Sequence, residues 1–137
     1  MSTSIIVVGA NGRMGKTISG LAAADEQFAL AGLVDSKERV AALAGAACPV
    51  SDSLADLLPK VPGAVVIDFT APAVSLQSAR AVAKTGNALV IGTTGLTDAD
   101  KDELRSLAAK APIFWASNMC TLLSGWGIMV LLLASTI

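Results

Sequence analysis

The chain has 137 residues with ten basic and eleven acidic side chains, a formal net charge of −1. This balance argues against partners such as nucleic acid or an anionic membrane, which attract clustered positive charge. The sequence contains no histidine, so Ser-His-Asp and Cys-His catalysis cannot occur within it. Cys48 and Cys120 have no spacing typical of a metal site or a disulfide framework. We therefore expect no bound metal and a reducing, cytoplasmic setting.

The composition also indicates the class of fold. Hydrophobic residues make up 53% of the chain and aromatic residues only 4%. An interior rich in alanine, valine, leucine and isoleucine is typical of a parallel sheet between helices rather than of an aromatic-rich β-sandwich. The length is that of a single domain with one core.

The first predicted element is a buried strand at Ser4–Val8, followed by a turn with three glycines and a helix at Arg13–Asp25. Gly9, Gly12 and Gly15 suit, in that order, a tight turn, a close approach of the backbone to a pyrophosphate, and tight helix–strand packing. The free N–H groups at the start of the helix would then face the phosphates. We expect Gly12 to be the least replaceable of the three, with a positive φ as one reason.

A glycine-rich turn without a ligand is the competing interpretation, and the second predicted strand weighs against it. That strand, Phe28–Asp35, ends with an acid about twenty residues after the last glycine, where the dinucleotide-binding fingerprint has its ribose-binding carboxylate. A carboxylate repels a 2′-phosphate, so Asp35 favours NADH without excluding NADPH. Nearby basic residues that would offset this repulsion are Lys16, Lys37 and Arg39.

The rest of the chain continues the alternation of strands and helices. Further strands are predicted at Ala64–Phe69, Ala88–Gly92 and Ile113–Ser117, and further helices at Lys37–Ala44, at Leu54–Leu58 with Ser53 as cap, from the cap Thr70 to Gly86, and from the cap Thr97 to before Pro112. This pattern predicts an α/β, Rossmann-like, doubly wound parallel sheet of five strands in the order 3-2-1-4-5. A ligand would lie at the C-terminal strand ends beside the first strand.

Three of these strand ends carry small or polar residues suited to a ligand. They are Asp68-Phe69-Thr70, Gly92-Thr93-Thr94-Gly95 and Ala116-Ser117-Asn118-Met119. The glycines allow close approach of the backbone to a ring, and the threonines and Asn118 offer hydrogen bonds. Alternatively, Thr70 and Thr97 are only helix caps and Asn118 is an ordinary turn residue. For Thr70 we give both interpretations equal weight.

Four blocks of the sequence, GANGRMG, VVIDFTAP, LVIGTTGL and PIFWASNM, resemble in the same order the N-terminal dinucleotide-binding half of dihydrodipicolinate reductases. The resemblance covers Ser4 to Met119. It implies NADH- or NADPH-dependent reduction of 4-hydroxy-tetrahydrodipicolinate to tetrahydrodipicolinate in the diaminopimelate/lysine pathway, generally by a homotetramer.

The resemblance also implies which residues bind the cofactor. They are Gly9, Ala10, Asn11, Gly12, Arg13, Met14, Asp35, Gly92, Thr93, Thr94, Ala116, Ser117, Asn118 and Met119. We add Phe69 from the strand end described above. No catalytic residue and no metal ligand is expected in this chain.

The family's second half carries a histidine pair followed by a lysine, and then a glycine–threonine pair, which bind and protonate the substrate; this chain lacks them. We therefore expect residues 1–119 to form the NAD(P)-binding domain and residues 120–137 an apolar tail, a remnant of the link to a missing substrate and tetramerisation domain. A truncated gene, a frameshifted gene and a deliberately cut gene would each give this pattern. We expect the chain alone to be inactive towards the substrate and to self-associate through its tail.

Two other functions compete with a reductase half. One is a standalone NAD(P)-binding module without catalysis. The other is a membrane-tethered protein, because residues 111–137 contain no charged residue. However, the uninterrupted apolar part, Trp126–Ala134, is much shorter than the roughly 20 residues that a membrane span needs. A helix buried against a second domain explains the tail more simply.

Overall fold

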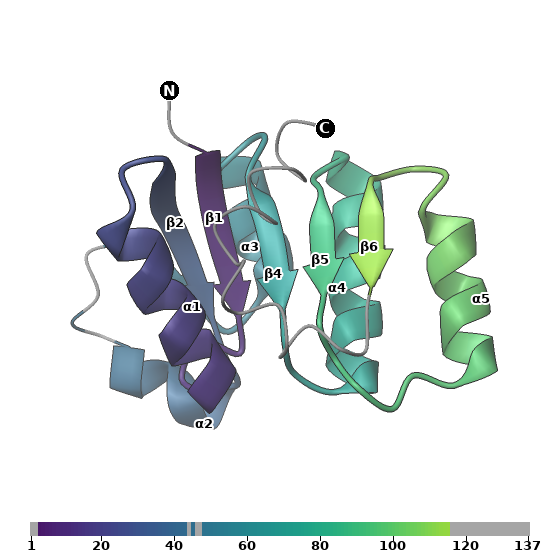
Figure 1. The fold of residues 1–137 in the computed structure, drawn as a ribbon, viewed down its shortest axis with the longest axis horizontal. Coiled ribbons are helices and arrows are strands. Elements are labelled where there is room, and N and C mark those ends of the chain that lie inside the picture. Colours follow the sequence, from purple (N-terminus) through teal and green to yellow (C-terminus); the bar gives the residue numbers. More distant parts are fainter. Residues whose placement is uncertain (1–2, 44, 46–47, 116–137) are drawn as a thin grey trace.

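The computed structural model describes residues 3–43, 45 and 48–115. Within them, six parallel strands form one sheet in the order β3-β2-β1-β4-β5-β6, with helices on both faces (Figure 1). In chain order the elements are β1 (Thr3–Val8), α1 (Arg13–Ala24), β2 (Phe28–Val34), α2 (Lys37–Val40), the 3-10 turn η1 (Ala41–Leu43), β3 (Val50–Ser51), α3 (Leu54–Leu57), the 3-10 turn η2 (Leu58–Lys60), β4 (Val65–Asp68), α4 (Pro72–Thr85), β5 (Leu89–Ile91), α5 (Asp98–Leu107) and β6 (Ile113–Trp115).

The central strand β1 aligns the ends of its neighbours. The side chains from Ile5 to Val8 are all buried, which is why an unbroken run of branched apolar residues suits this strand. Val8 pairs with Val34 of β2 and with Asp68 of β4, and Asp68 pairs with Ile91 of β5. The C-terminal ends of these four strands therefore lie side by side, where a doubly wound sheet binds its ligand.

Successive residues of β1 contact two different apolar layers. Ile5 and Val7 pack with Ile18 of α1, whereas Ile6 and Val8 pack with side chains of α3, α4 and α5. One face of the sheet is thus covered by α1 and the other by α3, α4 and α5. The prediction of an α/β, Rossmann-like, doubly wound parallel sheet is confirmed.

The predicted strand order is wrong in one respect. The strand β3, whose two residues pair with Leu33 and Val34, has no counterpart among the predicted strands, because so short a strand has no measurable periodicity. The strand predicted at Ala64–Phe69 was therefore expected outside the second strand. It is β4, and it lies beside β1 on the opposite side.

The helix ends are partly as predicted. Gly86 ends α4 with a φ of 82°, and Thr97 caps α5 in a capping box with Asp100; both predictions are confirmed. The prediction of Thr70 as the cap of α4 is wrong, because the N-cap is Ala71. The helix predicted at Lys37–Ala44 is the short α2 followed by η1.

Two predictions concern the C-terminal part of the chain. The boundary after residue 119 and the apolar tail 120–137 lie outside the described residues. Among residues 3–43, 45 and 48–115, no helix combines the length and the apolar character needed to span a membrane.

Candidate functional site

A cavity of about 670 Å³ opens at the C-terminal ends of β1, β2 and β4. Four segments far apart in the sequence contribute to its wall: residues 8–12 with the glycine turn, 34–39 from the end of β2 onward, 52–55 at the start of α3, and 69–81 from the end of β4 into α4. The lining residues that the sequence analysis had singled out are Gly9, Gly12, Asp35, Arg39, Phe69 and Thr70. The cavity thus lies where the sequence pattern places a ligand.

The glycine turn is held against β2 by its own backbone. Gly9 has a φ of 80°, and the N–H groups of Gly9 and Ala10 donate to the carbonyl of Val34 at 2.8 and 3.1 Å. A Cβ on Gly15 would lie 2.0 Å from the carbonyl oxygen of Gly9. Gly9 therefore makes the tight turn and Gly15 allows α1 to pack closely on it, as predicted.

Gly12 differs from the prediction. Its φ is −80°, so the expected positive φ is wrong. A Cβ at this position would meet one backbone atom, the carbonyl oxygen of Gly9, at 3.3 Å. The backbone accordingly tolerates a side chain at Gly12 better than at Gly15. A side chain at Gly12 would instead fill part of the cavity that this residue lines.

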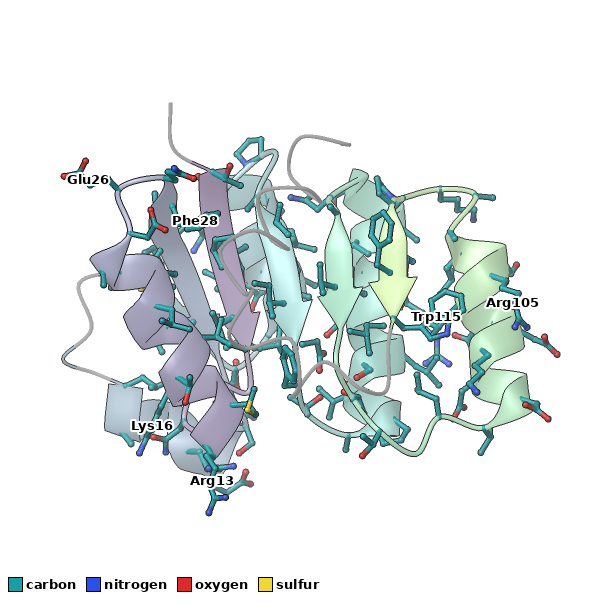
Figure 2. The ribbon with its side chains drawn as sticks, viewed as in Figure 1. Arg13, Lys16, Glu26, Phe28, Arg105 and Trp115 are labelled. Atoms are coloured by element: carbon teal, nitrogen blue, oxygen red, sulfur yellow. The ribbon has the colours of Figure 1, made fainter. Side chains whose placement is uncertain are left out.

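The start of α1 is well suited to an anion. Its N-cap is Gly12, which has no side chain to satisfy the free N–H groups of the first turn. The first turn contains Arg13 and Lys16 and no acidic residue. Figure 2 shows both basic side chains at the end of α1 toward which the strand arrows point. Amide groups, helix dipole and basic side chains all give this end positive potential.

Asp35 is fixed beside this turn. One carboxylate oxygen, Oδ2, accepts the backbone N–H of Asn11 at 2.8 Å, and Oδ1 accepts the N–H of Ser36 at 2.8 Å. The Arg39 guanidinium donates to the carbonyl oxygen of Asn11 at 3.0 Å. Since a carboxylate can accept about four hydrogen bonds, Asp35 retains capacity for two ligand hydroxyls.

The residues that follow β4 and β5 pack closely against each other and against the glycine turn. A Cβ on Gly92 would lie 2.1 Å from the ring of Phe69, and a Cβ on Gly9 would lie 2.6 Å from Cγ2 of Thr70. The structure therefore brings together the glycine turn, the Phe69–Thr70 segment and the loop after β5. It leaves Thr94 exposed but buries Thr93.

The hydroxyl of Thr93 is directed into the protein. It lies 2.7 Å from the Ser75 hydroxyl and accepts the N–H of Thr70 at 3.2 Å. The sequence pattern predicts instead that this hydroxyl faces a ligand. The buried polar cluster that engages the hydroxyl leaves no local signal in the sequence, because its partners are 18 and 23 residues away.

Asp68 is the centre of this cluster; the sequence places it among the strand-end residues that suit a ligand, but predicts no specific role for its carboxylate. Its side chain has no exposed surface. Burial raises the pKa of its carboxyl above the ordinary value, and hydrogen bonds from Thr70, Ser78 and Ser75 oppose this rise. A charged residue at the end of an otherwise apolar strand was the available signal. The predicted site residues Ala116, Ser117, Asn118 and Met119 lie outside the described residues.

The fold and site together define a class of protein. A glycine turn before an uncapped helix and an acid at the end of the second strand match the pyrophosphate and ribose contacts of Rossmann-like dinucleotide-binding domains. The comparison with known families then gives the particular one. The chain belongs to the family described as dihydrodipicolinate reductase, N-terminus, whose model matches residues 3–119.

Curated relatives agree with this family. A 4-hydroxy-tetrahydrodipicolinate reductase of Desulfovibrio desulfuricans is 78% identical over 119 residues, and one of Oleidesulfovibrio alaskensis is 52% identical over the same length. Each alignment covers 87% of this chain and 46% of the relative. The chain therefore spans about half the length of the curated relatives it matches.

Solved structures show the same fold. A dipicolinate-bound dihydrodipicolinate reductase from Paenisporosarcina sp. TG-14 superposes with a TM-score of 0.74 at 24% identity, covering 87% of this chain and 48% of that one. The protein GenD2 from gentamicin A biosynthesis, in complex with NAD, superposes with a TM-score of 0.69 at 22% identity, covering 86% and 35%. At these identities the likeness concerns the fold.

Proposed function

We propose that this chain binds NADH or NADPH and supplies the cofactor-binding half of a 4-hydroxy-tetrahydrodipicolinate reductase. Such an enzyme reduces 4-hydroxy-tetrahydrodipicolinate to tetrahydrodipicolinate in diaminopimelate and lysine biosynthesis. The family, the names of the curated relatives and the NAD-bound structural neighbour all support a nicotinamide dinucleotide. The observation that carries the proposal is the Asp35 carboxylate, held by Asn11 within the glycine turn at the start of α1.

Each part of the site has a defined role in this proposal. The turn from Gly9 to Met14 and the free N–H groups of α1 bind the pyrophosphate. Asp35 accepts the hydroxyls of the adenosine ribose. Phe69, the segment Gly92–Thr94 and the segment Ala116–Met119 surround the nicotinamide end. When bound, the cofactor supplies the hydride, and this chain's residues bind and orient it.

The remaining parts of the proposal concern what lies around this site. We assign residues 1–119 to the NAD(P)-binding domain and residues 120–137 to an apolar tail that promotes self-association. The cyclic dicarboxylate substrate binds only together with the second half found in the relatives, and the complete enzyme is a homotetramer.

The cytoplasm is the proposed compartment of this enzyme, since two cysteines without metal or disulfide spacing suit a reducing environment.

Titration with both cofactors tests this proposal. Following the fluorescence of the reduced nicotinamide, we expect saturable binding of NADH and weaker binding of NADPH, because Asp35 repels a 2′-phosphate. The substitution Asp35→Ala should weaken NADH binding by about tenfold, since it removes a charged acceptor worth about 1.5 kcal/mol. Binding of neither cofactor by the unmodified chain would refute the proposal.

A matched control is available at the other end of β2. The carboxylate of Asp25 also accepts a backbone N–H, that of Gln27 at 2.9 Å, but it lies before the strand, away from the cavity. Asp25→Ala should therefore leave the NADH affinity unchanged. A strong preference for NADPH in the unmodified chain would show that Asp35 does not contact the ribose.

A further inference from the structure

A buried group of polar side chains lies directly behind the cavity, where β4 ends. Asp68 and Ser75 have no exposed surface, and Ser78 and Thr93 are 3% and 5% exposed. Buried polar groups lower stability unless they are hydrogen-bonded. The hydrogen-bond partners of Asp68 therefore indicate what this buried carboxylate does.

The carboxylate of Asp68 is the acceptor in all of its side-chain hydrogen bonds. Its Oδ1 accepts the N–H of Thr70 at 3.0 Å, the hydroxyl of Thr70 at 2.5 Å and the hydroxyl of Ser75 at 3.1 Å. Its Oδ2 accepts the hydroxyl of Ser78 at 2.7 Å. An ionised carboxylate only accepts, so it fixes the orientation of all three hydroxyls.

The cluster continues into the loop after β5. Because Ser75 donates its proton to Asp68, the hydroxyl of Thr93 must donate to Ser75, 2.7 Å away. The same Thr93 oxygen accepts the N–H of Thr70 at 3.2 Å. In addition, the N–H of Gly92 donates to the backbone carbonyl of Asp68 at 2.9 Å. Asp68 thus connects the end of β4, the first turns of α4 and the end of β5.

The segments that Asp68 holds are those that shape the site. Thr70 packs on the glycine turn so closely that a Cβ on Gly9 would lie 2.6 Å from its methyl group, and the ring of Phe69 occupies the space where a Cβ of Gly92 would be. Phe69 and Thr70 both line the cavity. A small rotation of this segment would move it against either glycine.

We infer that Asp68 is a positioning residue for dinucleotide binding: its Oδ1 holds the Phe69–Thr70 segment and the Gly92–Thr93 loop in the arrangement that receives the nicotinamide end. This inference rests on the proposed function. It predicts that the acceptor oxygen matters and the negative charge does not, because every partner of Asp68 is a neutral N–H or hydroxyl donor.

Two substitutions at Asp68 separate the acceptor from the charge. Asp68→Val suits a buried strand end but removes the acceptor, and should weaken NADH binding by about tenfold, equivalent to about 1.4 kcal/mol. Asp68→Asn keeps an acceptor for Thr70 and Ser75, while its amide donates to the Ser78 hydroxyl. The NADH affinity of Asp68→Asn should therefore stay within about threefold of that of the unmodified chain.

A second ligand and a control residue distinguish positioning from general destabilisation. ADP contacts the adenosine end and the glycine turn but not the nicotinamide end, so Asp68→Val should weaken ADP binding by less than about threefold, clearly less than its effect on NADH. Asn87 is also buried and donates to the carbonyl of Ala64 at 2.9 Å, at the opposite end of the sheet. Asn87→Ala should lower the free energy of unfolding without altering NADH affinity.

The outcomes are distinct. An unchanged NADH affinity in Asp68→Val, an equal loss of ADP affinity, or an Asn variant as weak as the Val variant would each overturn the inference alone. Failure of the unmodified chain to bind NADH would refute the proposed function instead. If circular dichroism shows that Asp68→Val is unfolded, Ser75→Ala removes one donor of the cluster and should weaken NADH binding by about threefold; an unchanged affinity in that variant would also overturn the inference.

Discussion

The three glycines between β1 and α1 have different structural roles. Gly9 adopts a positive φ, and Gly15 leaves no room for a Cβ beside the carbonyl oxygen of Gly9. Gly12 has an ordinary φ and lines the cavity. A side chain at Gly15 therefore affects the fold, whereas one at Gly12 affects the site.

These roles predict different consequences for the same substitution. Gly15→Val should destabilise the fold by at least about 3 kcal/mol, because the backbone must move to admit the side chain. Gly12→Val should keep the circular dichroism spectrum and a cooperative unfolding transition, but weaken NADH binding by at least about tenfold. Normal NADH affinity in Gly12→Val would contradict the assignment of the glycine turn to the pyrophosphate.

Gly20 provides the control on the same helix. It is exposed, and a Cβ there would meet no atom within 4 Å. Gly20→Ala should raise the free energy of unfolding by about 0.5–1 kcal/mol, because alanine favours the helix. It should leave NADH binding unchanged.

The buried carboxylate of Asp68 predicts a dependence of stability on pH. Burial raises the pKa of Asp68 in the folded chain, so the protonated form favours folding. This contribution is fully present below the pKa of the unfolded chain and is lost as the pH rises through the raised pKa of the folded chain. Asp68→Asn does not titrate. Its free energy of unfolding, relative to that of the unmodified chain, should therefore increase between about pH 4 and pH 7. Urea unfolding at both pH values measures this, and a difference that does not vary with pH would contradict it.

Among the elements, α5 has the best-defined start. The hydroxyl of Thr97 accepts the N–H of Asp100 at 3.2 Å, and the Asp100 carboxylate accepts the N–H of Thr97 at 2.9 Å. Thr97→Ala should lower the free energy of unfolding by about 1 kcal/mol. The exposed Thr17, whose hydroxyl donates to the carbonyl of Arg13 at 3.1 Å, is the control, and its replacement by alanine should cost less than about 0.5 kcal/mol. Equal effects in urea unfolding would show that the capping box contributes nothing specific.

The strand β3 is the part of the described sheet that has no counterpart among the predicted strands. The strands and helices predicted from long apolar runs agree with β1, β2, α1 and α4 to within one or two residues. By contrast, β3 contains two residues, and its position beside β2 follows from pairing with Leu33 and Val34. A pairing of this kind depends on a distant segment and leaves no local pattern.

At the scale of the whole molecule, the chain is expected to bind cofactor without completing the reduction. A hydride leaves the nicotinamide only towards a substrate held against it, and the reduction needs a proton donor. The sequence has no histidine, and the chain matches 46% of the length of its curated relatives.

We therefore predict no substrate-dependent oxidation of NADH by this chain alone. The absorbance of the reduced nicotinamide, followed after addition of enzymatically generated substrate, measures the rate. The full-length Desulfovibrio desulfuricans relative serves as the positive control, and NADH binding in the same sample shows that the chain is folded. Turnover at about 1 s⁻¹ or faster, as is typical of enzymes, would show that the chemistry does not need the second half.

By itself, the sequence determined the class of fold, the glycine turn and the place of Asp35. These follow from local features: an apolar run of strand length, three glycines at fixed spacing and an acid that ends the next strand. The tertiary structure alone decided that β4 lies beside β1, that Gly15 rather than Gly12 has no room for a side chain, and that the Thr93 hydroxyl faces inward. The reason is physical. Each of these depends on which atoms meet across the sheet, as when Thr70 and Thr93 make contact across 23 residues of sequence, and no periodicity or propensity records such contacts.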